Sequence, residues 1–198
     1  MDIVLYHGNC PDGAGAAWVA RLALGADALI LPANYGDPLP LDVGALKPED
    51  SLYIIDFSYN REMLLGLKDT VGKLVLLDHH KSAEANLKGL DFCTFDMNRS
   101  GAMLAWNYFF PDNDPPYFIE LIQDRDLWLF KHGADTHNFY SWFVERELDF
   151  TKLAALYYSE DRLSEVMSLG EQWAEHNKLI IKRIAKTAGL GTIGKRLE

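Results

Sequence analysis

The chain has 198 residues, 48% of them hydrophobic and 24% charged, which is the balance of an ordinary globular protein of about one domain. Its formal net charge of -10 argues against an extended nucleic-acid duplex as a partner, because duplex binding requires clustered lysines and arginines. No run of about twenty apolar residues is present, so we expect no membrane-spanning helix. The two cysteines fit no disulfide framework, and the start lacks the basic region of a signal peptide, so we expect a cytoplasmic protein.

Short apolar segments alternate with segments of helical periodicity along the first part of the chain. We expect strands at residues 2–6, 28–32, 52–55, 73–77 and 92–95. We expect helices at residues 14–24, 61–68, 102–110 and 117–122. From Asp149 onward the pattern is helical, with a long helix around residues 163–186 and a loose glycine-containing tail at residues 189–194.

This alternation predicts an α/β fold: a doubly wound, mainly parallel sheet of about five strands flanked by helices, with a helical C-terminal segment. We divide the chain into an α/β domain over residues 1–148 and a helical segment over residues 149–198. In open α/β sheets, ligands bind outside the carboxyl ends of the strands. Residues that follow the expected strands are therefore candidates for a functional site.

Acidic and histidine side chains gather at these strand ends. They are His7, Asp12, Asp56, Asp78, His79 and His80, with Asp124 at the end of an expected helix. Carboxylate oxygens and neutral imidazole nitrogens are a ligand pair for Mn²⁺, Zn²⁺ or Fe²⁺. Taken singly, each residue has an ordinary alternative, such as a helix cap or a turn acid. Together they predict a divalent-metal site, since crowded carboxylates repel one another unless a cation lies between them.

The same residues, in this order, resemble the DHH phosphoesterase family, which includes RecJ-type exonucleases, oligoribonucleases and family II inorganic pyrophosphatases. The matching pieces are the run His7-Gly-Asn-Cys-Pro-Asp12-Gly13, then Asp56, then Asp78-His79-His80, then Asp124. The resemblance implies one or two Mn²⁺ ions, with Mg²⁺ or Co²⁺ as substitutes. It also implies hydrolysis of phosphoester or phosphoanhydride bonds.

The resemblance assigns the metal ligands residue by residue. Asp12, Asp56, His79 and Asp124 resemble the ligands of one metal. Asp56 would bridge this ion to a second one, and His7 resembles the histidine of that second site.

Three residues are candidates for catalysis rather than for metal binding. By the resemblance, His80 contacts phosphate or assists the leaving group, and Asp78 orients the histidines. We count Arg99 with them, because it stands near the expected metals just before a helix. Asp126 is expected to lie beside Asp124 without binding the metal itself.

Substrate contacts are expected from basic side chains and from a helix start. Lys81, Arg99 and Arg125 could bind phosphate, with a solvated surface charge as the alternative for each. Ser100 and Gly101 open a helix whose backbone amides could hold phosphate oxygens. Trp128 could lie in the core or stack on a nucleobase, and we expect it in the core.

Cys10 departs from the family pattern, which usually has an acid at this position. Its thiolate could bind the second metal, which would favour a softer ion than Mn²⁺. Alternatively, Asn9 substitutes for the acid, the second metal binds weakly, or Cys10 is a small buried residue of the turn.

We therefore expect a divalent-metal-dependent phosphoesterase that acts on short single-stranded oligonucleotides, nucleotides or other small phosphate esters. The alternatives are a pyrophosphatase or cyclic-dinucleotide phosphodiesterase, and a non-catalytic nucleotide-binding module. Many members of the family continue into a substrate-binding domain, to which residues 149–198 could be a linker. The sequence leaves the physiological substrate and the oligomeric state open.

Overall fold

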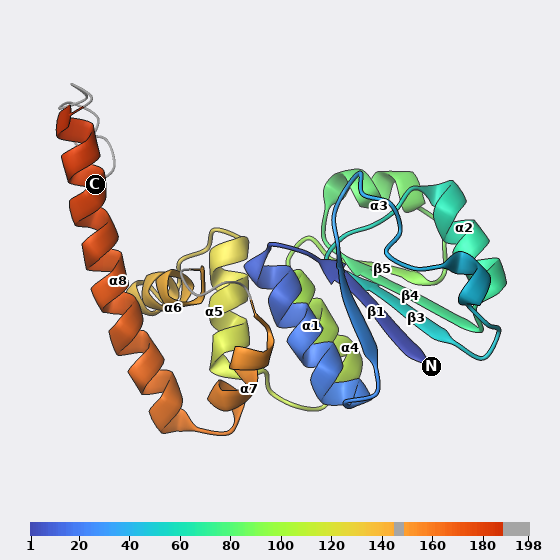
Figure 1. The fold of residues 1–198 in the computed structure, drawn as a ribbon, viewed down its shortest axis with the longest axis horizontal. Coiled ribbons are helices and arrows are strands. Elements are labelled where there is room, and N and C mark those ends of the chain that lie inside the picture. The colour runs from blue at the N-terminus through green and yellow to red at the C-terminus, as the bar shows by residue number, and fades with distance from the viewer. Residues whose placement is uncertain (145–148, 188–198) are drawn as a thin grey trace.

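The computed structural model describes residues 1–144 and 149–187 of the chain. Its centre is a five-stranded parallel sheet with the strand order β2-β1-β3-β4-β5 (Figure 1). The strands are β1 (Asp2–His7), β2 (Leu29–Ala33), β3 (Ser51–Ile55), β4 (Lys73–Asp78) and β5 (Cys93–Phe95). The expected fold class, a doubly wound parallel sheet flanked by helices, is thus confirmed.

The register of the central strands aligns their carboxyl ends. Tyr6 of β1 pairs with Ile55 of β3, and Ile55 pairs with Leu77 of β4. The next residue after each of these three is His7, Asp56 and Asp78, respectively. The strand order reverses between β1 and β3, and such a switch point is where open α/β sheets bind ligands.

Helices cover both faces of the sheet, because side chains of successive strand residues point to opposite faces. On one face, alternate residues such as Val4 and Ile55 pack with α1 (Pro11–Leu24) and α4 (Gly101–Phe109). On the other, residues such as Leu5 and Ile54 pack with α2 (Arg61–Thr70) and α3 (Lys81–Leu87). Figure 1 shows these two helical layers on either side of the strands.

The remaining helices form a separate layer beyond α1 and α4 (Figure 1). They are α5 (Tyr117–Asp126), α6 (Ala134–Val144), α7 (Thr151–Tyr157) and α8 (Glu160–Thr187). The α8 backbone approaches α6 so closely that a β-carbon at Gly170 would lie 1.9 Å from the carbonyl oxygen of Asn138. The far half of α8 projects from the body and leaves Ile181 and Ile184 exposed.

Several boundaries differ from those expected. The helix α1 starts at Pro11 rather than at residue 14, because proline suits the first helical position, which needs no amide donor. The helices α3 and α6 were not predicted; α3 is only seven residues long, and α6 is rich in aromatic and polar residues. The expected tail at residues 189–194 lies outside the described residues.

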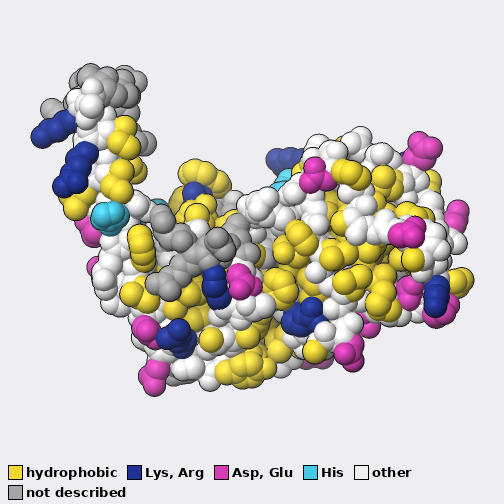
Figure 2. Space-filling model, in the orientation of Figure 1, with side chains coloured by type: hydrophobic (Ala, Val, Ile, Leu, Met, Phe, Trp, Pro, Cys, Tyr) yellow, Lys and Arg dark blue, Asp and Glu magenta, His cyan; other side chains and the backbone are white. Residues whose placement is uncertain are grey.

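Within the described part of the chain, no helix combines the length and the apolar character needed to cross a membrane. On the face seen in Figure 2, acidic and basic side chains are interspersed rather than gathered into one continuous stripe. Nothing on this face therefore resembles the positive track that a long duplex requires.

Candidate metal centre

The candidate metal centre lies at the switch point, around Asp56. This residue is 1% exposed and takes a left-handed backbone conformation (φ 68°), which is uncommon for any residue other than glycine. Its carboxylate is directed toward the start of α4, where a β-carbon at Gly101 would lie 2.7 Å from Asp56 Oδ1. A glycine at position 101 therefore provides the room that the carboxylate occupies.

The two carboxylate oxygens of Asp56 face different histidines. Oδ1 lies 3.2 Å from Nε2 of His79, and Oδ2 lies 3.4 Å from Nδ1 of His7. Burial alone would raise the pKa of Asp56, but the nearby imidazoles of His7 and His79 outweigh it and hold this pKa below its usual value. Asp56 is therefore an ionised carboxylate placed between two sets of candidate ligands.

The first set contains Asp12, His79 and Asp126. The Nε2 atom of His79 lies 3.6 Å from Oδ2 of Asp12 and 3.6 Å from Oδ2 of Asp126. Burial and the nearby charge of Asp56 raise the pKa of both Asp12 and Asp126. The carboxylates of Asp12, Asp56 and Asp126 thus repel one another around the His79 imidazole, and a bound cation would relieve this repulsion.

The second set contains His7, Cys10 and Asp56, each with one ligand atom within 4.8 Å of the others. Cys10 directly precedes α1, and burial together with the charge of Asp56 raises the pKa of its thiol to about 12. Without a cation, the thiol is therefore neutral at physiological pH. A bound divalent ion would reverse this, because a coordinating thiol is deprotonated by the metal charge.

The donors of both sets fit divalent cations. Oδ2 of Asp56 is buried and has no hydrogen-bond partner among the described residues, a state that costs free energy unless a cation or water satisfies it. The oxygen and nitrogen donors of the first set suit Mn²⁺ and similar ions, whereas the thiol of the second set would favour a softer ion.

Asp12 is held by a second helix besides its own. Its carboxylate accepts hydrogen bonds from the backbone amides of Gly101 (2.5 Å) and Ala102 (2.9 Å) at the start of α4. The hydroxyl of Ser100 caps the same helix by accepting from the amide of Met103. The amides of Ser100 and Gly101, which were expected to hold phosphate, donate to Gln123 and to Asp12 in this structure.

His80 is paired with Asp78 and, with Asp56 and His79, forms a third group whose ligand atoms lie within 4.8 Å of one another. Oδ1 of Asp78 lies 2.7 Å from Nδ1 of His80 and accepts hydrogen bonds from the amides of His79 and His80. The hydrogen bond with Asp78 raises the pKa of His80. The ring of Tyr35 packs edge-on against both His7 and His80, a contact that the turn-rich sequence around residue 35 did not indicate.

Asp126 lies among the candidate metal ligands, where Asp124 was expected. Both oxygens of Asp124 accept hydrogen bonds, from the amides of Lys131 and His132 and from the hydroxyl of Thr136, and Asp124 is in none of the candidate ligand groups among the described residues. Asp126, expected only as a supporting acid, lies in the first ligand set. Residues two positions apart on a helix face different sides, so one acid at most could reach the site, and the sequence did not indicate which.

The basic candidates are dispersed. Lys81 is exposed at the start of α3. Arg99 is exposed and lines a different cavity, together with Asp124 and His132, and its expected catalytic and phosphate-binding roles stay predictions. Arg125 lies beside the first ligand set and stacks on aromatic rings. Trp128 is 71% exposed, so the expectation that it lies in the core was wrong.

Comparison with known proteins gives two related sequences. An uncharacterized protein of Acanthamoeba polyphaga mimivirus is 31% identical over 199 residues, which cover 94% of this chain and 47% of that protein. The oligoribonuclease NrnB of Bacillus subtilis is 30% identical over 147 residues, which cover 63% of this chain and 36% of that protein. The chain thus spans less than half the length of either relative, and no family model matches it.

A solved structure shares the fold. It is the crystal structure of an uncharacterized protein from Helicobacter pylori, with a TM-score of 0.62 and 15% sequence identity. The alignment covers 93% of this chain and 62% of that one. At this identity the likeness concerns the fold alone.

Proposed function

We propose that this protein is a divalent-metal-dependent phosphoesterase of the DHH type that hydrolyses phosphodiester bonds of short single-stranded oligonucleotides or nucleotides. The observation that carries the proposal is the position of Asp56, whose two oxygens face His79 on one side and His7 on the other. A buried carboxylate shared between two ligand sets is the arrangement that a pair of divalent ions requires.

The residues suggest a division of labour. Asp12, Asp56, His79 and Asp126 would hold one ion, and His7, Asp56 and Cys10 would hold the other. When bound, such ions offset the negative charge of a phosphodiester and acidify the attacking water. His80 would deliver a proton to the departing oxygen from Nε2, because its Nδ1 is engaged by Asp78.

The likeness to NrnB supports the same class of reaction, since that relative is an oligoribonuclease. The DHH assignment itself rests on the ordered motifs from His7 to the Asp78-His79-His80 run. Mn²⁺ is the proposed ion for the first ligand set, with Mg²⁺ and Co²⁺ as alternatives.

The test is release of mononucleotides from labelled dinucleotides and trinucleotides by the purified protein, with Mn²⁺, Mg²⁺ or Co²⁺ added in turn. Asp56→Asn should lower turnover at least about 100-fold, because it removes the shared charge. Asparagine tolerates the left-handed conformation of position 56, so the backbone is kept.

Asp96→Asn is the matched control, because Asp96 follows β5 at the same sheet edge but belongs to neither ligand set. Its contact with the amide of Asn98 can be made by an asparagine oxygen as well. Turnover that survives Asp56→Asn, or protein that hydrolyses no phosphodiester with any of the three ions, would contradict the proposed function.

A further inference from the structure

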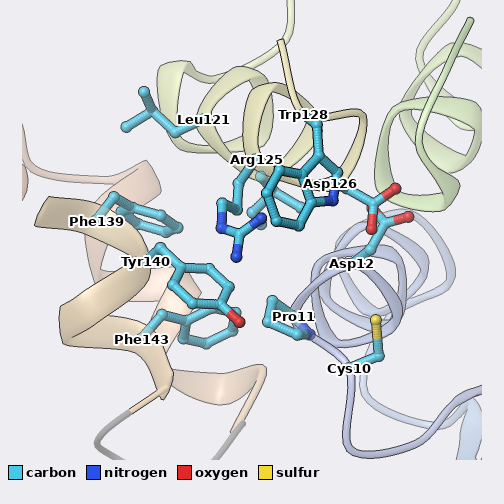
Figure 3. A pocket seen from close by; sticks show the side chains of 11 residues that line it. Cys10, Pro11, Asp12, Leu121, Arg125, Asp126, Trp128, Phe139, Tyr140 and Phe143 are labelled. Atoms are coloured by element: carbon cyan, nitrogen blue, oxygen red, sulfur yellow. The ribbon is translucent and has the colours of Figure 1, made fainter. Parts of the chain in front are cut away.

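A cavity of about 270 Å³ opens directly beside the first ligand set (Figure 3). One wall contains Cys10, Asp12 and Asp126. The facing wall is aromatic, with Tyr140 and Phe143 of α6, and Figure 3 shows the Arg125 side chain extending between the two walls. The cavity is thus acidic on the side of the proposed metals and apolar on the far side.

Arg125 is stacked rather than paired with an acid. Its guanidinium carbon lies 4.5 Å from the ring centroid of Trp128 and 4.6 Å from that of Tyr140. Among the described residues Arg125 forms no salt bridge, so its planar edge of N–H donors remains available. The guanidinium stacked on these rings presents its edge of donors, and the exposed Trp128 ring presents a stacking surface, as recognition of a flat, acceptor-bearing ring requires.

The segment that carries Trp128 is held in an unusual conformation. Both Trp128 (φ 54°) and Phe130 (φ 50°) are left-handed, which is rare for bulky side chains. The backbone carbonyl of Asp124 accepts from the amide of Leu129, and the Asp124 carboxylate accepts from the amide of Lys131. Asp124 thereby fixes the turn that keeps an indole at the mouth of the cavity, 71% exposed.

We propose that this cavity binds the nucleobase of a nucleotide whose phosphate lies at the metal ligands. This inference rests on the proposed function and adds a subsite to it. The base would stack within the group formed by Trp128, Arg125 and Tyr140, while Asp12 and Asp126 mark the end at which its phosphate meets the ions. Stacking accepts any base, because every base has a π-face.

Phosphate alone fits this cavity poorly. Most of its far wall is formed by Leu121, Phe139 and Phe143, whose side chains form no hydrogen bonds, so a doubly charged group there could be compensated only by Arg125 and the Tyr140 hydroxyl. A volume of about 270 Å³ suits a ring and its sugar rather than a long chain. The subsite therefore favours nucleotidyl substrates over pyrophosphate.

The test uses adenosine, which has a base but no phosphate, with metal-free protein and ligand-observed saturation-transfer NMR. We expect the base protons to receive more saturation than the ribose protons. Trp128→Ala and Tyr140→Ala should each weaken adenosine binding about 10-fold, whereas Tyr140→Phe should retain it. Tyr158→Ala is the control, because Tyr158 is 74% exposed and lies outside this cavity.

Arg125→Lys separates the base from phosphate as the partner of Arg125. Lysine keeps the charge, which suffices for phosphate, but loses the planar stack. Weakened adenosine binding in this variant supports the proposal. Unchanged adenosine binding in Arg125→Lys and both alanine variants overturns it, as does equal loss in Tyr158→Ala. Thermal melts of each variant show whether it is folded.

A hydrolysis assay distinguishes this inference from the proposed function. With Mn²⁺ and a dinucleotide, Trp128→Ala should raise KM about 10-fold and change kcat little. Adenosine binding at this cavity in a protein that hydrolyses no phosphodiester would refute the function and leave the subsite standing. Dinucleotide hydrolysis with an unchanged KM in Trp128→Ala would refute the subsite and leave the function standing.

Discussion

Gly101 and Asp56 are in such close contact that a β-carbon at position 101 would lie 2.4 Å from the β-carbon of Asp56. Real β-carbons do not approach so closely, so a side chain at position 101 must displace either the start of α4 or the buried carboxylate. Since α4 also holds Asp12 through its first amides, such a displacement would affect two ligands of the candidate centre at once.

Gly101→Ala should therefore lower the free energy of unfolding by about 1–3 kcal/mol, the usual cost of overpacking. It should also weaken Mn²⁺ binding. Urea unfolding and calorimetric titration measure the two effects. Gly66→Ala is the control: Gly66 lies inside α2 with open space around it, and this change should stabilise the protein by about 0.5–1 kcal/mol. Equal behaviour of the two variants would mean that the contact with Asp56 carries no cost.

Asp124→Asn and Asp126→Asn should have opposite effects. The first replaces an oxygen that accepts hydrogen bonds by an amide that donates, so it should cost about 1–3 kcal/mol of stability and leave Mn²⁺ affinity unchanged. The second removes one of three crowded carboxylates, so it should lower Mn²⁺ affinity without destabilising the metal-free protein. The reverse outcome would restore the ligand role that the sequence suggested for Asp124.

Binding of Mn²⁺ should release protons near neutral pH. Burial and Asp56 raise the pKa of Asp12 and Asp126; burial alone lowers the pKa of His79, but its hydrogen bond with Asp56 outweighs this and raises it. A metal binds the deprotonated groups, so affinity should increase as pH rises through the range of about pH 5–8. Calorimetry in buffers of different ionisation enthalpy counts the protons. Binding that is independent of both buffer and pH would exclude these residues as ligands.

Cys10→Asp should strengthen Mn²⁺ binding and lower the stability of the metal-free protein. The thiol is neutral without a cation because its pKa is raised to about 12, whereas an aspartate would add a carboxylate next to Asp56 and Asp12. The added negative charge destabilises the metal-free protein, because it repels the neighbouring carboxylates, and it stabilises the metal-bound protein, because it attracts the cation. Thermal melts with and without Mn²⁺ compare the two states. If the variant loses Mn²⁺ binding, the thiol has a role that a carboxylate cannot take.

The sequence was sufficient for the centre of the sheet because β1, β3 and β4 are short apolar runs that end in a polar residue or are directly followed by one. The sequence was also sufficient to predict that His7, Asp56 and Asp78 lie close together, because the parallel register aligns the carboxyl ends of β1, β3 and β4. This placement follows from chain geometry alone and does not depend on how side chains pack.

Other positions depended on packing, which the sequence does not display. The choice between Asp124 and Asp126 was decided by the turn after α5, which occupies the oxygens of Asp124. The exposure of Trp128 followed from a left-handed backbone that no propensity favours. Tyr140 entered the cavity from α6, a helix whose residues show little amphipathic pattern.

The two amides of α4 that bind Asp12 affect the order of folding and metal binding. Asp12 is already stabilised by backbone donors and by the positive end of a helix, so part of the repulsion among the acids is offset within the polypeptide. The amides of Gly101 and Ala102 therefore stabilise the negative charge of Asp12 in the metal-free protein. If the proposed ion binds here, folding and metal loading would be separable events, and the ion could be exchanged in the folded protein.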